Sequence, residues 1–312
     1  MSRLTATVFI IFLAAATQAQ TPHSVKDFNE RASERYAQGD YDGAIADFTR
    51  VIEMTSRPWV KEDPRRNNWS PSAERVGAAE GDRAMVLDPR AATAYTNRGI
   101  VRLAKGDADG AVSDFDRALA IAPGFVLAYY ARGMAWLYKG DAGRAFADYD
   151  KTLRLDPRFV EGYTGRGNAR LDAGDRAGAF ADYEQALRLA PRSAWAYYSR
   201  GDARRSTGDE AGAVADFERA MALDPRLTEP YCGRGLVRFE ARDFEGAIAD
   251  FTKALEMDGR LARAYGNRGL AFMLTGKDEA AERDFKRALA LAPYLRTELE
   301  AARAKVVKAL RR

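Results

Sequence analysis

The dipeptide Arg-Gly recurs six times in the chain, each time 34 residues after the previous copy and without drift. The copies begin at Arg98, Arg132, Arg166, Arg200, Arg234 and Arg268. A tyrosine precedes each arginine by three residues, and a pair made of aspartate and an aromatic residue follows it, from Asp114-Phe115 to Asp284-Phe285. A fixed period of this length is typical of a solenoid, in which each unit buries its apolar face only by stacking on its neighbours.

A single unit, residues 92–125, predicts two antiparallel helices. Helical spacing of apolar residues runs from about Thr93 to Lys105, and Gly106-Asp107 then ends the helix and turns the chain. A second helix is expected over about 109–121, before Pro123 breaks it. Gly99, facing Ala111, would allow the two backbones to approach closely.

These positions resemble the tetratricopeptide repeat over residues 92–295. The resemblance implies an all-α, right-handed superhelical solenoid of antiparallel helix pairs, in which the first helix of each pair lines a concave groove. The chain departs from the family at Arg98 and its equivalents, where many members carry leucine. It also departs at a common aromatic position, which is occupied here by Arg102, Arg170, Arg204 and Arg238.

The period divides the chain into about seven regular repeats and one degenerate repeat. Residues 25–58 form the first repeat, and residues 59–91 a degenerate one with a Trp/Pro-rich insertion, since Pro64 and Pro71 prevent a normal first helix. The regular repeats that follow are 92–125, 126–159, 160–193, 194–227, 228–261 and 262–295. Residues 296–312 are expected to form the amphipathic capping helix that the end of a solenoid needs.

The first nineteen residues have the three-part form of a secretory signal. Arg3 precedes the mostly apolar run from Leu4 to Ala16, and Thr17-Gln18-Ala19 supplies small residues at a cleavage site. The run is shorter than a bilayer-spanning helix, so cleavage near Ala19 is favoured over a retained anchor. We expect an exported protein, periplasmic or secreted, without stable membrane insertion after cleavage.

Composition excludes several functional classes. The 49 Lys and Arg residues and 45 Asp and Glu residues are interspersed, and the concentrated basic face of a nucleic-acid binder is missing. With one histidine, His23, and one cysteine, Cys232, the chain offers no His/Cys metal site and no internal disulfide. Nucleophile-elbow, phosphate-loop and zinc-protease motifs are absent. We therefore expect no catalytic residues, no cofactor and no metal.

The recurring arginines and aspartates predict a structural pairing. Each Arg-Gly arginine on a first helix occurs with an aspartate on the second helix, and Arg31 with Asp47 adds a seventh set. We interpret them as bridges within each repeat, because guanidinium and carboxylate match in geometry.

The ligand-binding candidates are the positions that, by resemblance, face the groove and vary between repeats. They are Thr96, Ile100, Tyr130, Met134, Tyr138, Asn168, Asp172, Trp195, Tyr198, Asp202 and Arg205. Aromatic residues and arginine are typical anchors of interfaces. The predicted function is a non-enzymatic scaffold or adaptor of the cell envelope that binds a protein or peptide. The Lys/Asn clamp of the co-chaperone members is absent, so recognition of a chaperone C-terminus is not implied.

The sequence is also compatible with two other functions. In a glycan-binding or enzyme-accessory subunit, Tyr130, Tyr138 and Trp195 would stack on sugar rings. A structural spacer would instead self-associate through an end repeat. The segment 55–72 carries Trp59 and Trp69, which belong either to an accessory loop beside the groove or to a decayed repeat whose gap they fill.

Overall fold

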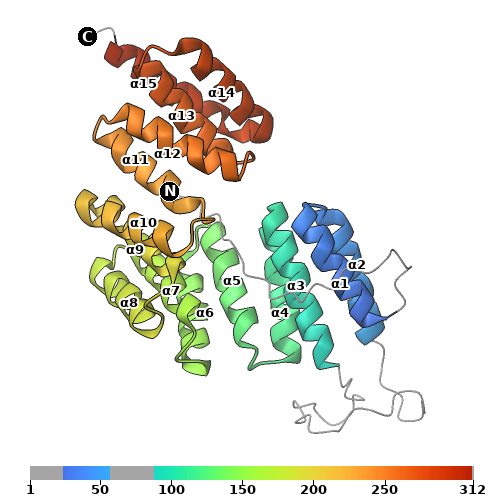
Figure 1. The fold of residues 1–312 in the computed structure, drawn as a ribbon. Coiled ribbons are helices and arrows are strands. Elements are labelled where there is room, and N and C mark those ends of the chain that lie inside the picture. The colour runs from blue at the N-terminus through green and yellow to red at the C-terminus, as the bar shows by residue number, and fades with distance from the viewer. Residues whose placement is uncertain (1–23, 57–87, 311–312) are drawn as a thin grey trace, which may run out of the picture. The chain divides into compact units, whose positions relative to one another are not determined.

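The computed structural model describes residues 24–56 and 88–310, which form α-helices and one short 3-10 turn, with no strand among them. Consecutive helices pair antiparallel, as Figure 1 shows, and the predicted all-α repeat fold is confirmed. The first seven helices are α1 (Val25–Gln38), α2 (Tyr41–Thr55), α3 (Pro89–Lys105), α4 (Ala108–Ile121), α5 (Val126–Tyr138), α6 (Ala142–Leu155) and α7 (Val160–Asp172). The others are α8 (Arg176–Leu189), α9 (Ala194–Thr207), α10 (Glu210–Leu223), α11 (Glu229–Glu240), α12 (Phe244–Met257), α13 (Ala262–Leu274), α14 (Asp278–Leu291) and α15 (Arg296–Leu310).

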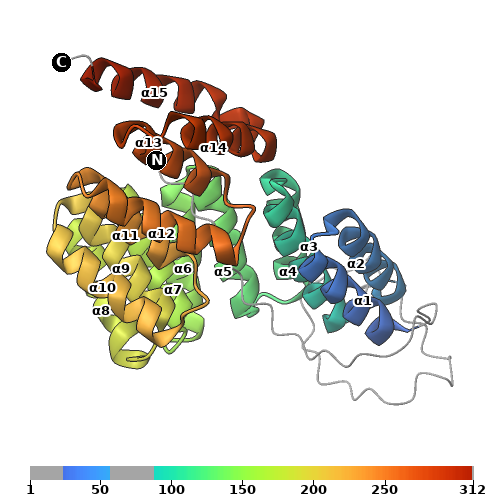
Figure 2. The ribbon, with the colours of Figure 1, turned by 45° about the horizontal axis from the view of Figure 1, so that its top comes forward.

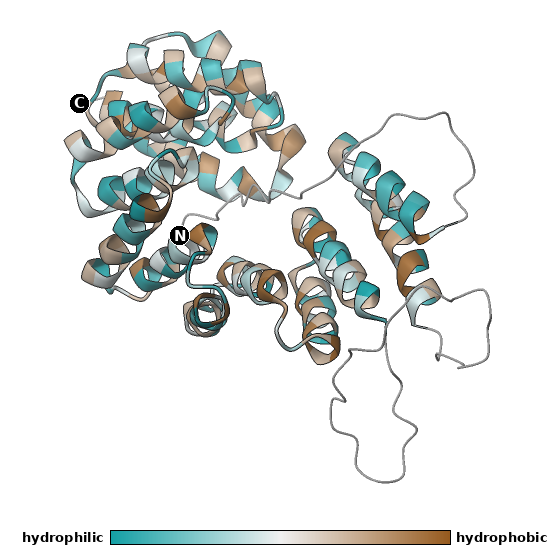
Figure 3. Cartoon of the chain, turned by 60° about the horizontal axis from the view of Figure 1, so that its bottom comes forward, coloured by the Kyte–Doolittle hydropathy of each residue, from teal (hydrophilic) through white to brown (hydrophobic). Residues whose placement is uncertain are grey.

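The chain forms two compact units, divided inside α7 between Gly165 and Arg166. Within the first unit, α1 to α4 lie side by side as two antiparallel pairs (Figure 2). Hydrophobic and hydrophilic residues alternate along the helices of both units (Figure 3), as expected for helices that bury one stripe each. In the part of the chain that the structure describes, no helix combines the length and the apolar character needed to cross a bilayer.

Helix α3 packs directly on α2. Arg98 Nη1 donates a hydrogen bond to Thr49 Oγ1 at 2.9 Å, and the same contact joins Arg268 to Thr252 at 3.0 Å between the neighbouring helices α12 and α13. The helices α2 and α3 therefore meet as the second and first helices of successive repeats, with no helix pair between them. A degenerate repeat was expected over residues 59–91. Its residues 59–87 lie outside the described part of the chain, and its residues 89–91 belong to α3.

The turn inside each repeat has a common design. A glycine in the left-handed region ends the first helix in six repeats, with φ between 71° and 94°, at Gly39, Gly106, Gly140, Gly174, Gly208 and Gly276. In most repeats the following aspartate caps the second helix: Asp209, for example, accepts a hydrogen bond from the backbone N–H of Gly212 at 2.9 Å. The turn is therefore fixed by local chemistry rather than by contacts between repeats.

In one repeat an arginine, Arg242, replaces the glycine of this turn. Arg242 adopts φ 63° at the position equivalent to Gly208 and Gly276. A side chain in this region is strained, so Arg242→Gly is expected to raise the free energy of unfolding by about 0.5–1 kcal/mol, despite the added freedom of the unfolded chain. Urea denaturation of the two proteins measures the difference, and a less stable glycine variant would contradict the assignment of strain.

Each repeat is filled by one aromatic side chain from its second helix. These rings are at most 2% exposed and belong to Phe48, Phe115, Tyr149, Tyr183, Phe217, Phe251 and Phe285. They lie against the Arg-Gly glycines: a Cβ atom added to Gly99 would lie 2.6 Å from Phe115 Cε1, and one on Gly201 would lie 2.9 Å from Phe217 Cδ1. Gly99 therefore faces the ring of Phe115, whereas the sequence analysis expected Ala111 opposite it; the glycine makes room for a buried aromatic side chain.

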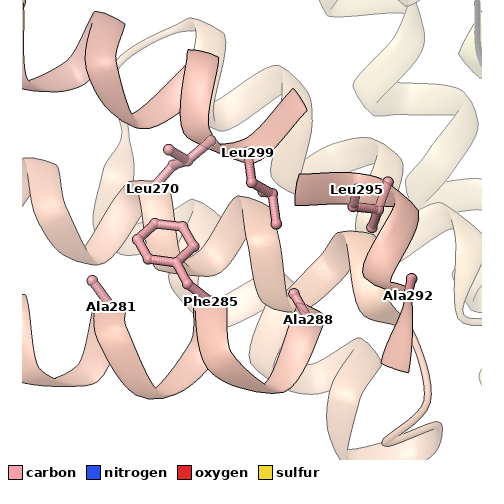
Figure 4. Close-up of a cluster of buried hydrophobic side chains, with 7 residues drawn as sticks. All are labelled: Leu270, Ala281, Phe285, Ala288, Ala292, Leu295 and Leu299. Carbon is pink, nitrogen blue, oxygen red and sulfur yellow. The ribbon is translucent and has the colours of Figure 1, made fainter. Parts of the chain in front are cut away.

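Helix α15 covers the apolar end of the second unit. Its Leu299 packs with Leu270, Phe285 and the 3-10 turn residue Leu295 in one buried cluster (Figure 4). Ala302 and Val306 continue the same apolar stripe. The last repeat therefore does not leave its apolar face open to water, as the end of a solenoid requires.

Within each unit, the first helices of successive pairs contact one another. Helix α3 contacts α5 in the first unit, and α9 contacts α11 and α11 contacts α13 in the second. The second helices of successive described repeats pack less closely on each other. Because a stack curves toward the helices that are closer together, the first helices present the inner surface of each unit.

Candidate functional site

Seven arginine–aspartate bridges hold the first and second helices of the repeats together. In every bridge the arginine Nε donates to the aspartate Oδ2 at 2.7–3.0 Å, and Nη2 donates to Oδ1 of the same carboxylate. The carboxylates are only 1–6% exposed. The pairs are Arg31–Asp47, Arg98–Asp114, Arg132–Asp148, Arg166–Asp182, Arg200–Asp216, Arg234–Asp250 and Arg268–Asp284. The predicted intra-repeat pairing is confirmed, and these carboxylates belong to the scaffold.

Five bridges contain a second arginine, which the sequence analysis did not assign to them. Its Nη1 donates to the aspartate Oδ2 at 2.8–2.9 Å and to a glycine carbonyl of the second helix at 3.1–3.4 Å. These arginines are Arg35, Arg102, Arg170, Arg204 and Arg238. The signal was visible in the sequence, because each follows the Arg-Gly arginine, or its equivalent Arg31, by four residues, one helical turn.

In the first unit, most of the predicted ligand-binding positions are part of the core. Thr96, with 0% exposure, donates to the carbonyl of Ala92, and Ile100 is 2% exposed. Met134 is 9% exposed. None of the three offers a ligand appreciable surface, because each side chain is enclosed by its own and neighbouring helices.

The two tyrosines predicted in the same unit differ from each other. The Tyr130 ring lies 5.8 Å from the ring of Tyr149 and 5.2 Å from that of Phe159, and burial raises its pKa well above the ordinary value. Tyr138, at the end of α5, is 38% exposed. Tyr130 therefore contributes to packing, while Tyr138 is the more accessible of the predicted positions in this unit.

In the second unit, four predicted residues form one stripe along α9. Trp195, Tyr198, Asp202 and Arg205 are spaced by three or four residues and lie on one face of the helix. The rings of Trp195 and Tyr198 are 5.1 Å apart, and that of Tyr198 lies 6.1 Å from Phe217. All four side chains keep partial exposure. The structure thus brings these predicted residues together on an inner helix.

Polar residues of the adjacent first helices flank this stripe. Asn168 of α7 accepts a hydrogen bond from Tyr183 Oη at 2.7 Å. Arg205 Nη2 donates to Asp202 Oδ1 at 3.0 Å, and its Nη1 donates to Glu240 of α11 at 3.3 Å. We use the term α9 face for the stripe together with these neighbours, which are Asn168 and Asp172 of α7 and Glu229 and Glu240 of α11.

Burial and neighbouring carboxylates raise the pKa values of two groups on the α9 face. Partial burial raises the pKa of Asp172, and the neighbouring carboxylate of Asp202 raises it further. The pKa of Tyr198 is raised well above its ordinary range by burial, with added contributions from Asp202 and Glu229. Both shifts disfavour further negative charge at this place.

The two other predicted positions, Trp59 and Trp69, lie outside the described residues. Within residues 24–56 and 88–310, no group of three or more His, Cys, Asp or Glu side chains is arranged to hold a metal ion.

The thiol of Cys232 on α11 is expected to react slowly in the native protein. Burial, with smaller contributions from Glu229 and Asp250, raises the pKa of this thiol to about 12. An ordinary cysteine has a pKa of about 8.5, so the reactive thiolate at pH 8 is about a thousandfold scarcer in the native protein. Cys232 keeps some exposure. We nevertheless expect Ellman's reagent to label it more than about 100-fold more slowly in the native protein than in denaturing urea, because only the thiolate reacts. Native labelling within tenfold of the unfolded rate would contradict this assignment.

Comparisons with known families and structures agree with this architecture. The family model described as tetratricopeptide repeat matches residues 29–125 and 232–296, a further tetratricopeptide model matches 196–227, and a TPR repeat model matches 167–208. A search of curated proteins found no match.

Solved structures of low sequence identity share the fold. A tetratricopeptide repeat protein from Parabacteroides merdae is 18% identical, with a TM-score of 0.62 over 91% of this chain and 98% of that one. Yeast Tom70 is 17% identical, with a TM-score of 0.62 over 93% of this chain and 66% of its own. The Cut9–Hcn1 hetero-tetramer of APC/C is 14% identical, with a TM-score of 0.58 over 88% of this chain and 55% of that chain.

The family matches fall on the repeats of both units, where the glycine turns, the buried aromatic rings and the helix pairs recur every 34 residues. The chain belongs to the tetratricopeptide repeat family.

Proposed function

We propose that the chain is a non-enzymatic scaffold that docks a segment of a partner protein on the α9 face. The observation that carries this proposal is the contrast between the bridges and the α9 face. The bridge carboxylates are buried and doubly paired, whereas Trp195, Tyr198, Asp202 and Arg205 keep exposed surface on an inner helix. Aromatic side chains and arginine carry much of the binding energy of protein interfaces.

The fold supports the same role. Tetratricopeptide repeats are in general scaffolds rather than catalysts, and one solved structure of this fold is a hetero-tetramer. Successive first helices place side chains in rows on one surface, which suits an extended or helical segment. The docking would be non-covalent and would need no cofactor.

Affinity capture tests this function. We compare the tagged wild type with the variant Trp195→Ala/Arg205→Ala. The control variant, Glu184→Ala/Arg219→Ala, changes two exposed residues of the second helices α8 and α10. We expect a specific partner to be retained by the wild type and by the second-helix control and lost from the first variant. Matched thermal melts must show that all three proteins are folded. Equal retention by all three would contradict docking on the α9 face.

We also propose that this docking takes place in the cell envelope after export. The support is the charged start, apolar run and small-residue cleavage site of residues 1–19. Cell fractionation with an immunoblot tests the proposal: the exported form should be smaller than the precursor by about this segment. A full-length product confined to the cytosol would contradict export.

A further inference from the structure

The chain contains three Asp-Gly sequences, in which a carboxyl group precedes an unshielded backbone nitrogen. They are Asp42-Gly43, Asp109-Gly110 and Asp258-Gly259. Glycine has no side chain to hinder its own nitrogen and restricts the backbone least, so this nitrogen reacts with the preceding carboxyl group wherever the chain can rotate to bring them together. The local backbone therefore decides which of the three sequences is reactive.

Two of the sequences are held in helices. Asp42-Gly43 and Asp109-Gly110 lie in the first turns of α2 and α4. Their glycine N–H groups donate to the N-cap carboxylates of Asp40 and Asp107, both at 2.9 Å. A rotation that brought either nitrogen onto the neighbouring carboxyl group would break these bonds and the helical turn. Both sequences are therefore protected, although their aspartate side chains are 79% and 85% exposed.

Asp258-Gly259 lies instead in the turn between α12 and α13, outside both helices. The Gly259 N–H makes no hydrogen bond within the described ranges, and the nearest atoms to a Cβ added at this residue are 3.8 and 4.0 Å away. Asp258 Oδ1 accepts from the backbone N–H of Arg260 at 3.0 Å and from its Nε at 3.4 Å. Because these contacts belong to an exposed turn, rotation at Asp258 leaves the ladders of α12 and α13 intact.

The same turn in three other repeats carries proline in place of Gly259. The aspartate before the proline likewise accepts a hydrogen bond from the N–H two residues later, at 2.9–3.0 Å; these aspartates are Asp88, Asp156 and Asp224. Proline has no N–H, so these turns lack a nucleophilic nitrogen. Asp258, with φ −136° and ψ 99°, has nearly the backbone of Asp224, with φ −138° and ψ 94°. Gly259 therefore adds a reactive nitrogen to a turn whose geometry suits proline.

We propose that Asp258 is a site of spontaneous covalent modification, at which the folded protein converts aspartate into isoaspartate through a cyclic succinimide. The Gly259 nitrogen attacks Cγ of the protonated carboxyl group: a C–N bond forms, and the hydroxyl group leaves with the amide proton as water. Water then adds to one of the two succinimide carbonyls. Opening at Cγ restores aspartate, whereas opening at the main-chain carbonyl routes the backbone through Cβ and Cγ. The product has the mass of the starting protein, and no oxidant or reductant takes part.

The modification changes the turn between the last two repeats. Isoaspartate adds one carbon to the main chain and converts the side-chain acceptor of the Arg260 N–H into backbone. Its new α-carboxylate is the group that isoaspartyl methyltransferases methylate with S-adenosylmethionine. This chemistry is independent of docking on the α9 face.

Peptide mapping of the aged full-length chain tests this proposal. The protein is incubated for several weeks at mildly acidic pH, where more carboxyl groups are protonated than at neutrality. After digestion, mass spectrometry with electron-transfer fragmentation measures isoaspartate separately at the three Asp-Gly sequences. We expect at least about tenfold more at Asp258 than at Asp42 or Asp109, because only the two helical sequences must open locally before they react. In denaturing urea the three should react at comparable rates.

Gly259→Pro is the matched variant, because it restores the residue of the other turns and removes the nucleophilic N–H. It should form no isoaspartate at residue 258 and keep the thermal melt of the wild type. Absence of isoaspartate from Asp258 in the aged wild type, or equal amounts at all three sequences, would overturn the proposal. A preference for Asp258 that persists in urea would also overturn it, since the fold would then not select the site.

Discussion

Replacing Asp216 with alanine is expected to lower the free energy of unfolding of its repeat by about 3–5 kcal/mol, the cost of removing one partner from a buried ion pair. Asp216 is 3% exposed and accepts hydrogen bonds from Arg200 at 2.7 and 2.9 Å and from Arg204 at 2.9 Å. Alanine would leave two guanidinium groups without their carboxylate between α9 and α10. Urea denaturation gives the total loss, and hydrogen exchange shows whether protection falls first in these two helices.

Glu218 provides the control on the same helix. Its carboxylate also pairs with an arginine, Arg234 at 3.1 Å, but its side chain is 55% exposed. Glu218→Gln is therefore expected to cost less than about 1 kcal/mol, as exposed ion pairs generally do. If the two substitutions cost the same, burial would not be what makes the arginine–aspartate bridges important to the scaffold.

Gly201→Val is expected to destabilise the same repeat by about 3 kcal/mol through overpacking. A Cβ atom there would lie 2.9 Å from two ring atoms of Phe217 and 3.2 Å from Asp216 Cβ. Phe217 is fully buried, so its ring has no free space into which it could move. The midpoint of urea denaturation measures the loss.

Gly259→Val is the matched control for this substitution. At Gly259 the nearest atoms to an added Cβ are the Leu255 carbonyl oxygen at 3.8 Å and Tyr265 Oη at 4.0 Å, which are ordinary contacts. We expect its stability to stay within about 1 kcal/mol of the wild type, as for most surface substitutions. A Gly201→Val variant as stable as Gly259→Val would show that the helices separate easily at the Arg-Gly position.

Much of the fold was predictable because the repeat compares the chain with itself. The recurrence of Arg200-Gly201 and Asp216-Phe217 at fixed spacing indicated which side chains meet, and the structure places them in contact. Local turn chemistry at Gly208-Asp209 likewise needs no information from outside the repeat. Sequence alone therefore predicted the helix pairs and the bridges.

The groove positions were harder to predict, because position within a repeat does not determine exposure. Thr96 and Tyr198 are equivalent by register, yet Thr96 is fully buried and bonded to its own helix, whereas Tyr198 keeps exposed surface beside Trp195. The direct contact of α2 with α3 was missed for a related reason: the length of the intervening segment suggested a repeat, and only the contacts show that α2 and α3 are neighbours.

Site-specific photo-crosslinking tests docking on the inner helices most directly. Benzoylphenylalanine is placed at Ser206, an exposed residue of α9 beside Arg205, or at Glu184, an exposed residue of the second helix α8. The proposed function predicts that irradiation in the native extract yields a discrete crosslinked partner from position 206 and none from position 184. Crosslinks from position 184 alone, or equal yields from both positions, would contradict docking on the α9 face.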